Sequence, residues 1–273
     1  IYLAMARILN TKNDLDYVSL MVQTLNLILL TAPELASLRK TLKISFQENA
    51  NDQERIIFVS LFKCWTHNAV STFSLCLLAQ AYHISASLVQ KFADADVTVG
   101  FLMQLDKLVQ LLESPIFIQL RLHLLETDSY LREDLLKSLY GILMLLPQSQ
   151  AYKTLSDRLA TVSSLHMHIG LLNIHRPNPS SDVVAKKGPA ADAKKRITLP
   201  NGMESVESLV QHFEATQAKH TEFRLSALRA KSLLPEATQS ASTPIAATAS
   251  VSAGNEKKEE VQSVATESTT ANA

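Results

Sequence analysis

Glycine is scarce in this chain, and aromatic residues and cysteines are also few. Six glycines occur among 273 residues, aromatic residues make up 6%, and there are two cysteines. A β-sandwich needs glycine-rich turns and aromatic or β-branched runs, so this composition argues against one. A phosphate-binding loop needs closely spaced glycines, and no two glycines here lie close together. Two cysteines are too few for a disulfide framework, which favours a reducing, cytosolic location.

The sequence also lacks a net charge and a long apolar run. Lysine plus arginine and aspartate plus glutamate number 26 each. Electrostatic attraction to nucleic acid or to anionic lipid is therefore not expected, and any membrane contact should be indirect. The nearest candidate for a membrane span, Cys64 to Tyr82, lacks charge but contains too many polar residues. We expect a buried helical hairpin there.

Hydrophobic residues, which make up 47% of the chain, recur at helical spacing through the first 163 residues. Residues that favour the start of a helix recur along this pattern. Asp, Asn and Ser are common N-cap residues, and Pro is tolerated in the first turn. The expected caps are Asp14, Asp52, Asn68 and Ser129, with Asp94 or Asp96 before the helix that starts near Val97, and the expected first-turn prolines are Pro33 and Pro115. The sequence predicts about nine short helices joined by short links.

Helix pairs in this region start roughly 30–40 residues apart, which is typical of HEAT or armadillo repeats. The predicted fold is therefore an all-α, helix-pair α-solenoid. No sequence motif shared between the units is evident, so the repeat is expected to be structural only. A compact helical bundle is the alternative, although bundles prefer longer helices of similar length.

Four regions follow from the changes in pattern. Residues 1–163 form the HEAT-like scaffold region, and 164–203, rich in Pro, Ser, Ala and Lys, read as a flexible linker. Residues 204–230 form a detached amphipathic helix, and 231–273 a disordered tail. An isolated helix is marginal in water, so we expect Leu209, Phe213 and Phe223 to bind a partner surface, or to cover the last repeat of the chain itself. The chain starts with Ile1 rather than Met, so we expect it to be part of a longer protein.

No catalytic, cofactor or metal motif is found. His166 and His168 lack a third ligand nearby, and His212 and His220 are too far apart on one helix for a single ion, so surface positions are expected for them. Cys64 and Cys76 are expected to be small buried hydrophobic residues rather than a redox pair. The basic residues of the linker resemble a nuclear import signal, but such runs are common in solvated linkers: Lys186, Lys187, Lys194, Lys195 and Arg196.

Several long runs resemble a known family. They are LNLILLTAPELASLR from Leu25, LFKCWTHNAVSTFSLCLLAQAY from Leu61, VTVGFLMQLDKLVQLLESPIFIQLRL from Val97 and SLYGILMLLPQSQAY from Ser138. They are similar, in the same order, to the C-terminal region of the vacuole-morphology scaffold family, also called the associated regulator of PIKfyve. The run SLVQHFEATQAKH from Ser208 resembles the terminal helix of that family.

The resemblance implies a HEAT-repeat scaffold without enzymatic activity or cofactor. Its implied partners are a PIKfyve-type phosphoinositide kinase, an opposing Sac-family phosphatase and further copies of itself. Such a complex regulates phosphatidylinositol 3,5-bisphosphate on the cytosolic face of endosomal and vacuolar membranes. The alternative is an armadillo-like trafficking or import adaptor that reads short peptides, which would need an Asn or Trp ladder; Trp65 is the single tryptophan.

Overall fold

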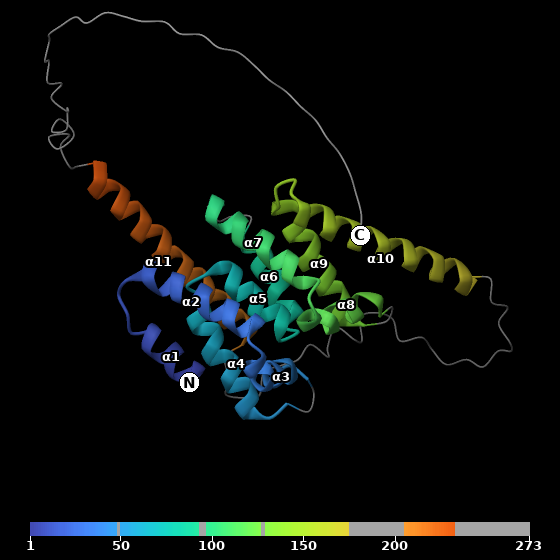
Figure 1. Ribbon diagram of the computed structural model, residues 1–273, viewed down its shortest axis with the longest axis horizontal. Helices are drawn as coiled ribbons and strands as arrows, with labels where there is room; N and C mark the ends of the chain where they lie inside the picture. The colour runs from blue at the N-terminus through green and yellow to red at the C-terminus, as the bar shows by residue number, and fades with distance from the viewer. Residues whose placement is uncertain (48–49, 93–96, 127–128, 175–204, 233–273) are drawn as a thin grey trace, which may run out of the picture. The chain divides into compact units, whose positions relative to one another are not determined.

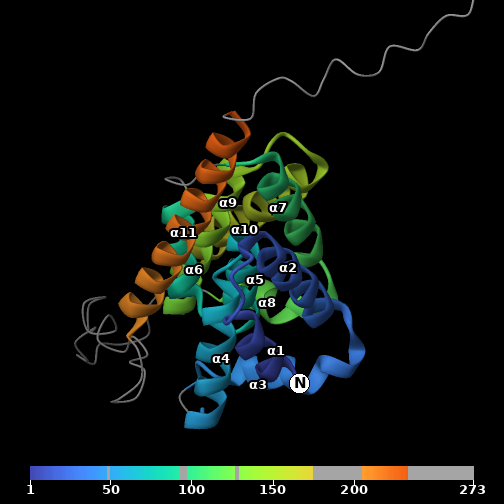
Figure 2. The same ribbon diagram turned by 90° about the vertical axis from the view of Figure 1, so that its left-hand side faces the viewer.

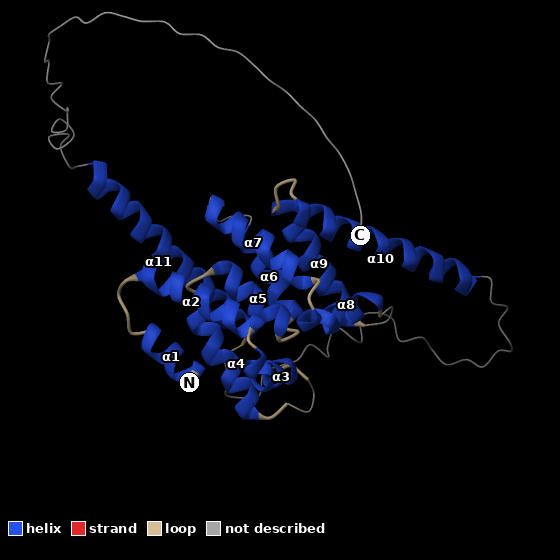
Figure 3. Cartoon of the chain, in the orientation of Figure 1, coloured by secondary structure: helices blue, strands red, loops and turns tan. Residues whose placement is uncertain are grey.

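Helices are the regular elements in every part of the chain that the structure describes (Figures 1 and 3). The computed structural model describes residues 1–47, 50–92, 97–126, 129–174 and 205–232. The elements in chain order are α1 (Tyr2–Leu9), α2 (Leu15–Thr31), η1 (Pro33–Leu35), α3 (Ala36–Ile44), α4 (Asp52–Trp65), α5 (Ala69–Leu78), α6 (Tyr82–Phe92), α7 (Val99–Leu112), η2 (Pro115–Phe117), α8 (Ile118–Leu125), α9 (Tyr130–Leu145), α10 (Gln150–Ile174) and α11 (Val206–Ser232). The fold is an all-α helical solenoid, as predicted.

The helices contact both their neighbours in sequence and helices farther along the chain. α2 contacts α5, α5 contacts α7, α7 contacts α10, and α6 contacts α9. Successive helices also pack together, as α3 does with α4, α5 with α6, and α8 with α9. These contacts join the apolar faces of the helices into a continuous core, as in a solenoid.

Most of the predicted helix starts are confirmed by side-chain caps. The Asp14 and Asn68 side chains accept hydrogen bonds from the backbone N–H groups of residues three positions on, and the Ser129 hydroxyl accepts one from Leu131. The cap of α4 was predicted one residue late, because Asn51 and Glu54 form a capping box there. Thr98 caps α7, and the candidates Asp94 and Asp96 lie outside the described residues.

The short helix α5 is the most deeply buried element of the described chain. It carries no charged residue, and every residue from Val70 to Leu78 is buried. It is covered by α2, α3, α4, α6 and α7. A helix that is apolar on all sides must be enclosed by other elements, so α5 fixes the positions of the helices around it.

Three buried polar side chains tie α2, α4 and α5 together. The Trp65 indole donates to Asn26 Oδ1 at 3.2 Å, and the Asn26 amide donates to Ser74 Oγ at 3.3 Å. Trp65 is fully buried and Asn26 is 9% exposed. Buried polar groups that lack hydrogen-bond partners destabilise a fold, so this network favours one relative arrangement of the three helices.

The chain repeats one motif, LLxxPxxxxLRxxL, at 29–42 and at 111–124. In both copies a helix ends, a proline begins a 3-10 turn, and the next helix departs at 84° in the first copy and 73° in the second. The Arg39 guanidinium donates to the carbonyls of Leu29 and Ala32, and that of Arg121 donates to Leu112 and Ser114. Carbonyls at the end of a helix lack the regular partners of the helix interior, so the hydrogen bonds from the arginine stabilise the bend. The prediction that the units share no motif was therefore wrong.

Among the described helices, none is both long and apolar enough on its own to cross a bilayer. Two bent helix pairs reach the required length and hydropathy only when their halves are taken together.

The structure corrects two of the predicted boundaries. α10 continues to Ile174, so the linker does not start at Ser164. The helix predicted over 204–230 is present as α11, but it is not detached, because it packs against α4 and α6 within one compact unit that includes residues 1–229. The rest of the predicted linker and most of the predicted tail lie outside the described residues.

The contact between α6 and α9 leaves no room for a side chain at Gly141. A Cβ atom there would lie 2.1 Å from Val89 Cγ1, and the Ser85 and Ser138 hydroxyls are hydrogen bonded at 2.8 Å one turn away. Gly141→Ala should therefore lower the free energy of unfolding by about 1–3 kcal/mol, although alanine is the better helix former. Urea unfolding of the full chain measures this.

Gly100 provides the matched control, because a Cβ there would meet only Thr98 Oγ1, at 3.9 Å. Gly100→Ala should be neutral or slightly stabilising. Adding Val89→Ala to Gly141→Ala should recover part of the loss, because it removes the clashing methyl groups. Equal effects of the two glycine substitutions would contradict the close approach of α6 and α9.

Candidate protein-binding site

The first half of α11 is seated on the solenoid through a narrow stripe of side chains. The stripe has helical spacing and consists of Leu209, Phe213, Thr216 and His220, which are 0%, 2%, 5% and 8% exposed. Phe213 lies against Phe92 at the end of α6, with ring centroids 6.1 Å apart. Burying one such apolar side chain contributes roughly 1.5–3 kcal/mol. Figure 2 shows α11 running beside α6.

Polar contacts fix the register of α11 on the end of α4. The Gln217 amide donates to the Thr66 carbonyl at 2.6 Å, and the Thr66 and Thr216 hydroxyls lie 3.4 Å apart. Lys91 and Glu214 form an ion pair at 2.6 Å, but both are about two-fifths exposed, so it adds little stability. The buried stripe and the Thr66 carbonyl therefore hold the helix.

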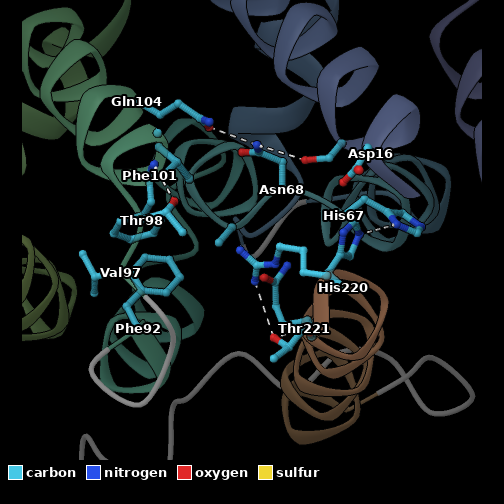
Figure 4. Close-up of a pocket in the computed structure, with 16 residues that line it drawn as sticks. Asp16, His67, Asn68, Phe92, Val97, Thr98, Phe101, Gln104, His220 and Thr221 are labelled. Atoms are coloured by element: carbon cyan, nitrogen blue, oxygen red, sulfur yellow. Dashed lines mark hydrogen bonds between the residues drawn. The ribbon is translucent and has the colours of Figure 1, made fainter. Parts of the chain in front are cut away.

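Two histidines meet where α11 crosses the turn between α4 and α5. His67 Nδ1 and His220 Nε2 are 3.0 Å apart, so one nitrogen donates and the other accepts (Figure 4). Burial, together with the neighbouring His220, His212 and Lys219, lowers the pKa of His67 to about 4. Burial and Arg224 lower the pKa of His220, while Asp16 raises it. Both imidazoles are therefore neutral at physiological pH.

A cavity of about 200 Å³ lies beside this pair, between α11 and the first turns of α5 and α7 (Figure 4). Asn68 spans its wall and donates to Gln104 Oε1 at 2.9 Å and to Ser19 Oγ at 3.5 Å. The lining mixes amides, hydroxyls, two neutral imidazoles and aromatic rings, and its charged members are Asp16 and Arg224. It is smaller than the roughly 300–1,000 Å³ of a site for a drug-sized molecule.

The second half of α11 makes no comparable buried contact with the solenoid. Phe223, Leu225 and Leu228 are 36%, 49% and 63% exposed. Arg224 and Arg229 are exposed on the same segment. α11 is thus divided at His220 into two parts. The docked half is residues 206–220, and the free half, residues 221–230, presents apolar and basic side chains to solvent.

The structure separates the three predicted contact residues. Leu209 and Phe213 are buried within the same chain, so they are not exposed to a partner as predicted. Phe213 packs on Phe92 of α6, in the middle of the solenoid, and not on its last repeat as the alternative expected. Phe223 is partly exposed and stays a prediction. His220 is buried, not a surface residue as predicted, and its partner His67 was not singled out. The alternation of apolar and polar residues along α11 showed its buried stripe, but nothing local pointed to Thr66 or His67.

The remaining candidate residues are placed as follows. Cys64 and Cys76 are free and buried, as predicted. His166 and His168 lie on α10, and no group of three or more potential metal ligands comes together in the described ranges.

The histidine pair makes the seating of α11 sensitive to acid. The pKa of His67 is about 4 in the folded chain and about 6.5 in an unfolded one, so the unfolded chain binds more protons between these values. The free energy of unfolding should therefore fall as the pH drops through this window, by up to about 1.4 kcal/mol per pH unit for each histidine. Urea midpoints at about pH 7 and about pH 5 measure the loss.

The variant with both His67→Gln and His220→Gln should lose less stability over this range than the wild type. His168→Gln is the control, because His168 is exposed on α10 and is not one of the groups that shift the pKa of either histidine. Parallel losses in all three proteins would show that the pair does not titrate on unfolding.

Comparison with protein families shows to which family this chain belongs. The family described as "Vacuolar protein 14 C-terminal Fig4p binding" matches residues 1–162, which is more than half of the chain. The match covers α1 to α9 and the first half of α10, and α11 lies outside it. No solved structure matches at a significant level.

Three curated proteins illustrate the similarity. The chain is 47% identical over 182 residues to "Protein VAC14 homolog" of Schizosaccharomyces pombe, covering 67% of the chain and 22% of that protein. It is 48% identical over 171 residues to "Protein VAC14 homolog" of Arabidopsis thaliana, covering 62% and 22%. It is 39% identical over 163 residues to "Vacuole morphology and inheritance protein 14" of Saccharomyces cerevisiae, covering 60% and 18%. The chain spans about a fifth of the length of these relatives, and it belongs to the family of Vac14 C-terminal, Fig4p-binding regions.

Proposed function

We propose that this chain is the assembly region of a non-catalytic scaffold that binds a Sac-family phosphoinositide phosphatase. In the same complex it binds a PIKfyve-type lipid kinase and further copies of itself. Bringing a kinase and its opposing phosphatase onto one support couples the synthesis and turnover of phosphatidylinositol 3,5-bisphosphate. The complex acts on the cytosolic face of endosomal and vacuolar membranes.

The observation that carries the proposal is the family match over residues 1–162, whose description names Fig4p binding. A solenoid suits this role because it offers extended surfaces for protein partners. Exposed large apolar side chains on several helices of this region agree with contact surfaces; they include Leu20, Val99, Met103 and Met144.

Self-association is assigned to the free half of α11. Phe223 and Leu228 are exposed although α11 is held firmly at its other end, so the free half is presented in a fixed direction. A preorganised helix loses little conformational entropy when a second copy covers it. This half lies outside the region matched by the Fig4p-binding family, which leaves the solenoid surface available for the phosphatase.

Binding of the phosphatase is tested with the full chain. The immobilised chain should capture a purified Sac-family phosphatase saturably in biolayer interferometry. An unrelated HEAT-repeat protein serves as the control surface. Absence of saturable binding by the folded chain would refute the proposed phosphatase-binding role.

Self-association is tested on the free half of α11. Phe223→Asp combined with Leu228→Asp should lower the oligomer mass in native mass spectrometry, because burying a charge in an apolar contact is costly. The helical circular dichroism signal and phosphatase binding should stay unchanged. Ala218→Asp, on the exposed side of the docked half, should leave the mass as it is. An unchanged mass in the double variant would remove the free half from the self-association surface.

A further inference from the structure

A groove runs along the solenoid surface between α2 and α7. Its floor is the recessed helix α5, which supplies Val70, Ser71 and Ser74. α2 and α7 both contact α5 and stand on either side of it. Because α5 presents only small side chains here, the groove is hollow, with a volume of about 180 Å³.

The α2 wall of the groove presents leucines to solvent. Leu20 and Leu27 are 60% and 53% exposed, although both line the groove. They are seven residues apart on one helix, which is two turns or about 10 Å. Gln23 and Thr24 lie between them on the same wall. Apolar side chains rimmed by uncharged polar groups are typical of a protein-binding surface.

The α7 wall carries Gln104, Lys107, Leu108 and Leu111. Lys107 is the one charged residue of the groove lining, and within the described residues no carboxylate pairs with it. The groove is therefore apolar with a single positive charge on its rim. An occupant that complements it combines bulky apolar side chains with a carboxylate.

The size of the groove favours side chains of a protein over a free small molecule. Its volume lies below the roughly 300–1,000 Å³ of sites that enclose drug-sized ligands. It is large enough for one or two bulky side chains, and its walls extend over about two turns of α2 and of α7. This matches an amphipathic segment laid along the groove with its apolar face inward.

The family match indicates which partner occupies the groove. Every residue of its lining falls between Leu20 and Leu111, near the middle of the matched Fig4p-binding region. α11, to which self-association is assigned, lies outside that region. We propose that the groove between α2 and α7 is the docking site of the Sac-family phosphatase, which inserts apolar side chains beside Leu20 and Leu27 and places a carboxylate next to Lys107. This inference rests on the proposed function.

Affinity measurements on the full chain test the assignment. Leu20→Glu combined with Leu27→Glu should weaken phosphatase binding about 30-fold or more, because central apolar contacts dominate binding energy. Lys107→Glu should weaken binding about five-fold, as expected for a charge on the rim of an interface. The control is Leu122→Glu combined with Leu125→Glu on α8, where both leucines are 47% exposed. The control should bind within about three-fold of the wild type.

A cross-link identifies what occupies the groove. Cys64 and Cys76 are buried, and burial raises the pKa of Cys64 to about 12 and also raises that of Cys76, so neither reacts readily with maleimides. Thr24→Cys therefore provides a single reactive thiol on the rim for a benzophenone maleimide. Irradiation with purified phosphatase should join the two proteins, and Ile8→Cys on the exposed side of α1 is the control site.

The outcomes separate the possibilities. Wild-type chain that fails to bind the phosphatase refutes the proposed function itself. Wild-type binding that is unaffected by the α2 variant, or equally weakened by the α8 control, refutes only the groove. Cross-links between copies, with a lower oligomer mass in the α2 variant, would assign the groove to a second copy. Cross-links within one chain, with tighter phosphatase binding in the α2 variant, would assign it to a segment of the same chain.

Discussion

The burial of α5 from Val70 to Leu78 is the constraint on which the rest of this structure depends. A ten-residue helix without a charged side chain gains stability only when it is enclosed, and α2, α3, α4, α6 and α7 enclose it. The Asn26, Trp65 and Ser74 network satisfies polar atoms within this enclosure and so fixes which faces of α2 and α4 turn inward. α5 is shorter than α2 and α7, and its side chains that face outward between them are small. A groove therefore remains between α2 and α7, with α5 as its floor.

The same burial explains where α11 sits. Phe92, at the end of α6, packs on Phe73 of α5, on Phe101 of α7 and on Phe213 of α11. α11 thus covers the side of the solenoid at which α6 ends. Its buried contacts extend as far as the pair of His67 and His220. Beyond this pair the helix continues without buried contacts, so one element serves as structural cover in its first half and as an exposed surface in its second.

The two proposed contact surfaces are separated in the sequence and in the structure. The matched region contains the groove, while the free half of α11 lies outside it. A partner held in the groove and a second copy held on α11 would not compete for the same residues, so the proposed scaffold could hold both at once. The arginines of the two LLxxPxxxxLRxxL motifs hold the bends at the ends of α2 and α7, and these helices form the walls of the groove.

The sequence by itself determined the all-α class, most helix starts and ends, and the family. Helix periodicity, the caps Asp14, Asn68 and Ser129 and the breaks at Pro33 and Pro115 act within a few residues, so they are visible in the linear sequence. Only the tertiary structure decided that Leu209 and Phe213 are core residues, that Val89 leaves Gly141 no room for a side chain, and that Leu20 and Lys107 face one groove. These contacts join residues far apart in the chain, as between Gln217 and Thr66, 151 positions away, and no local pattern encodes which apolar faces meet.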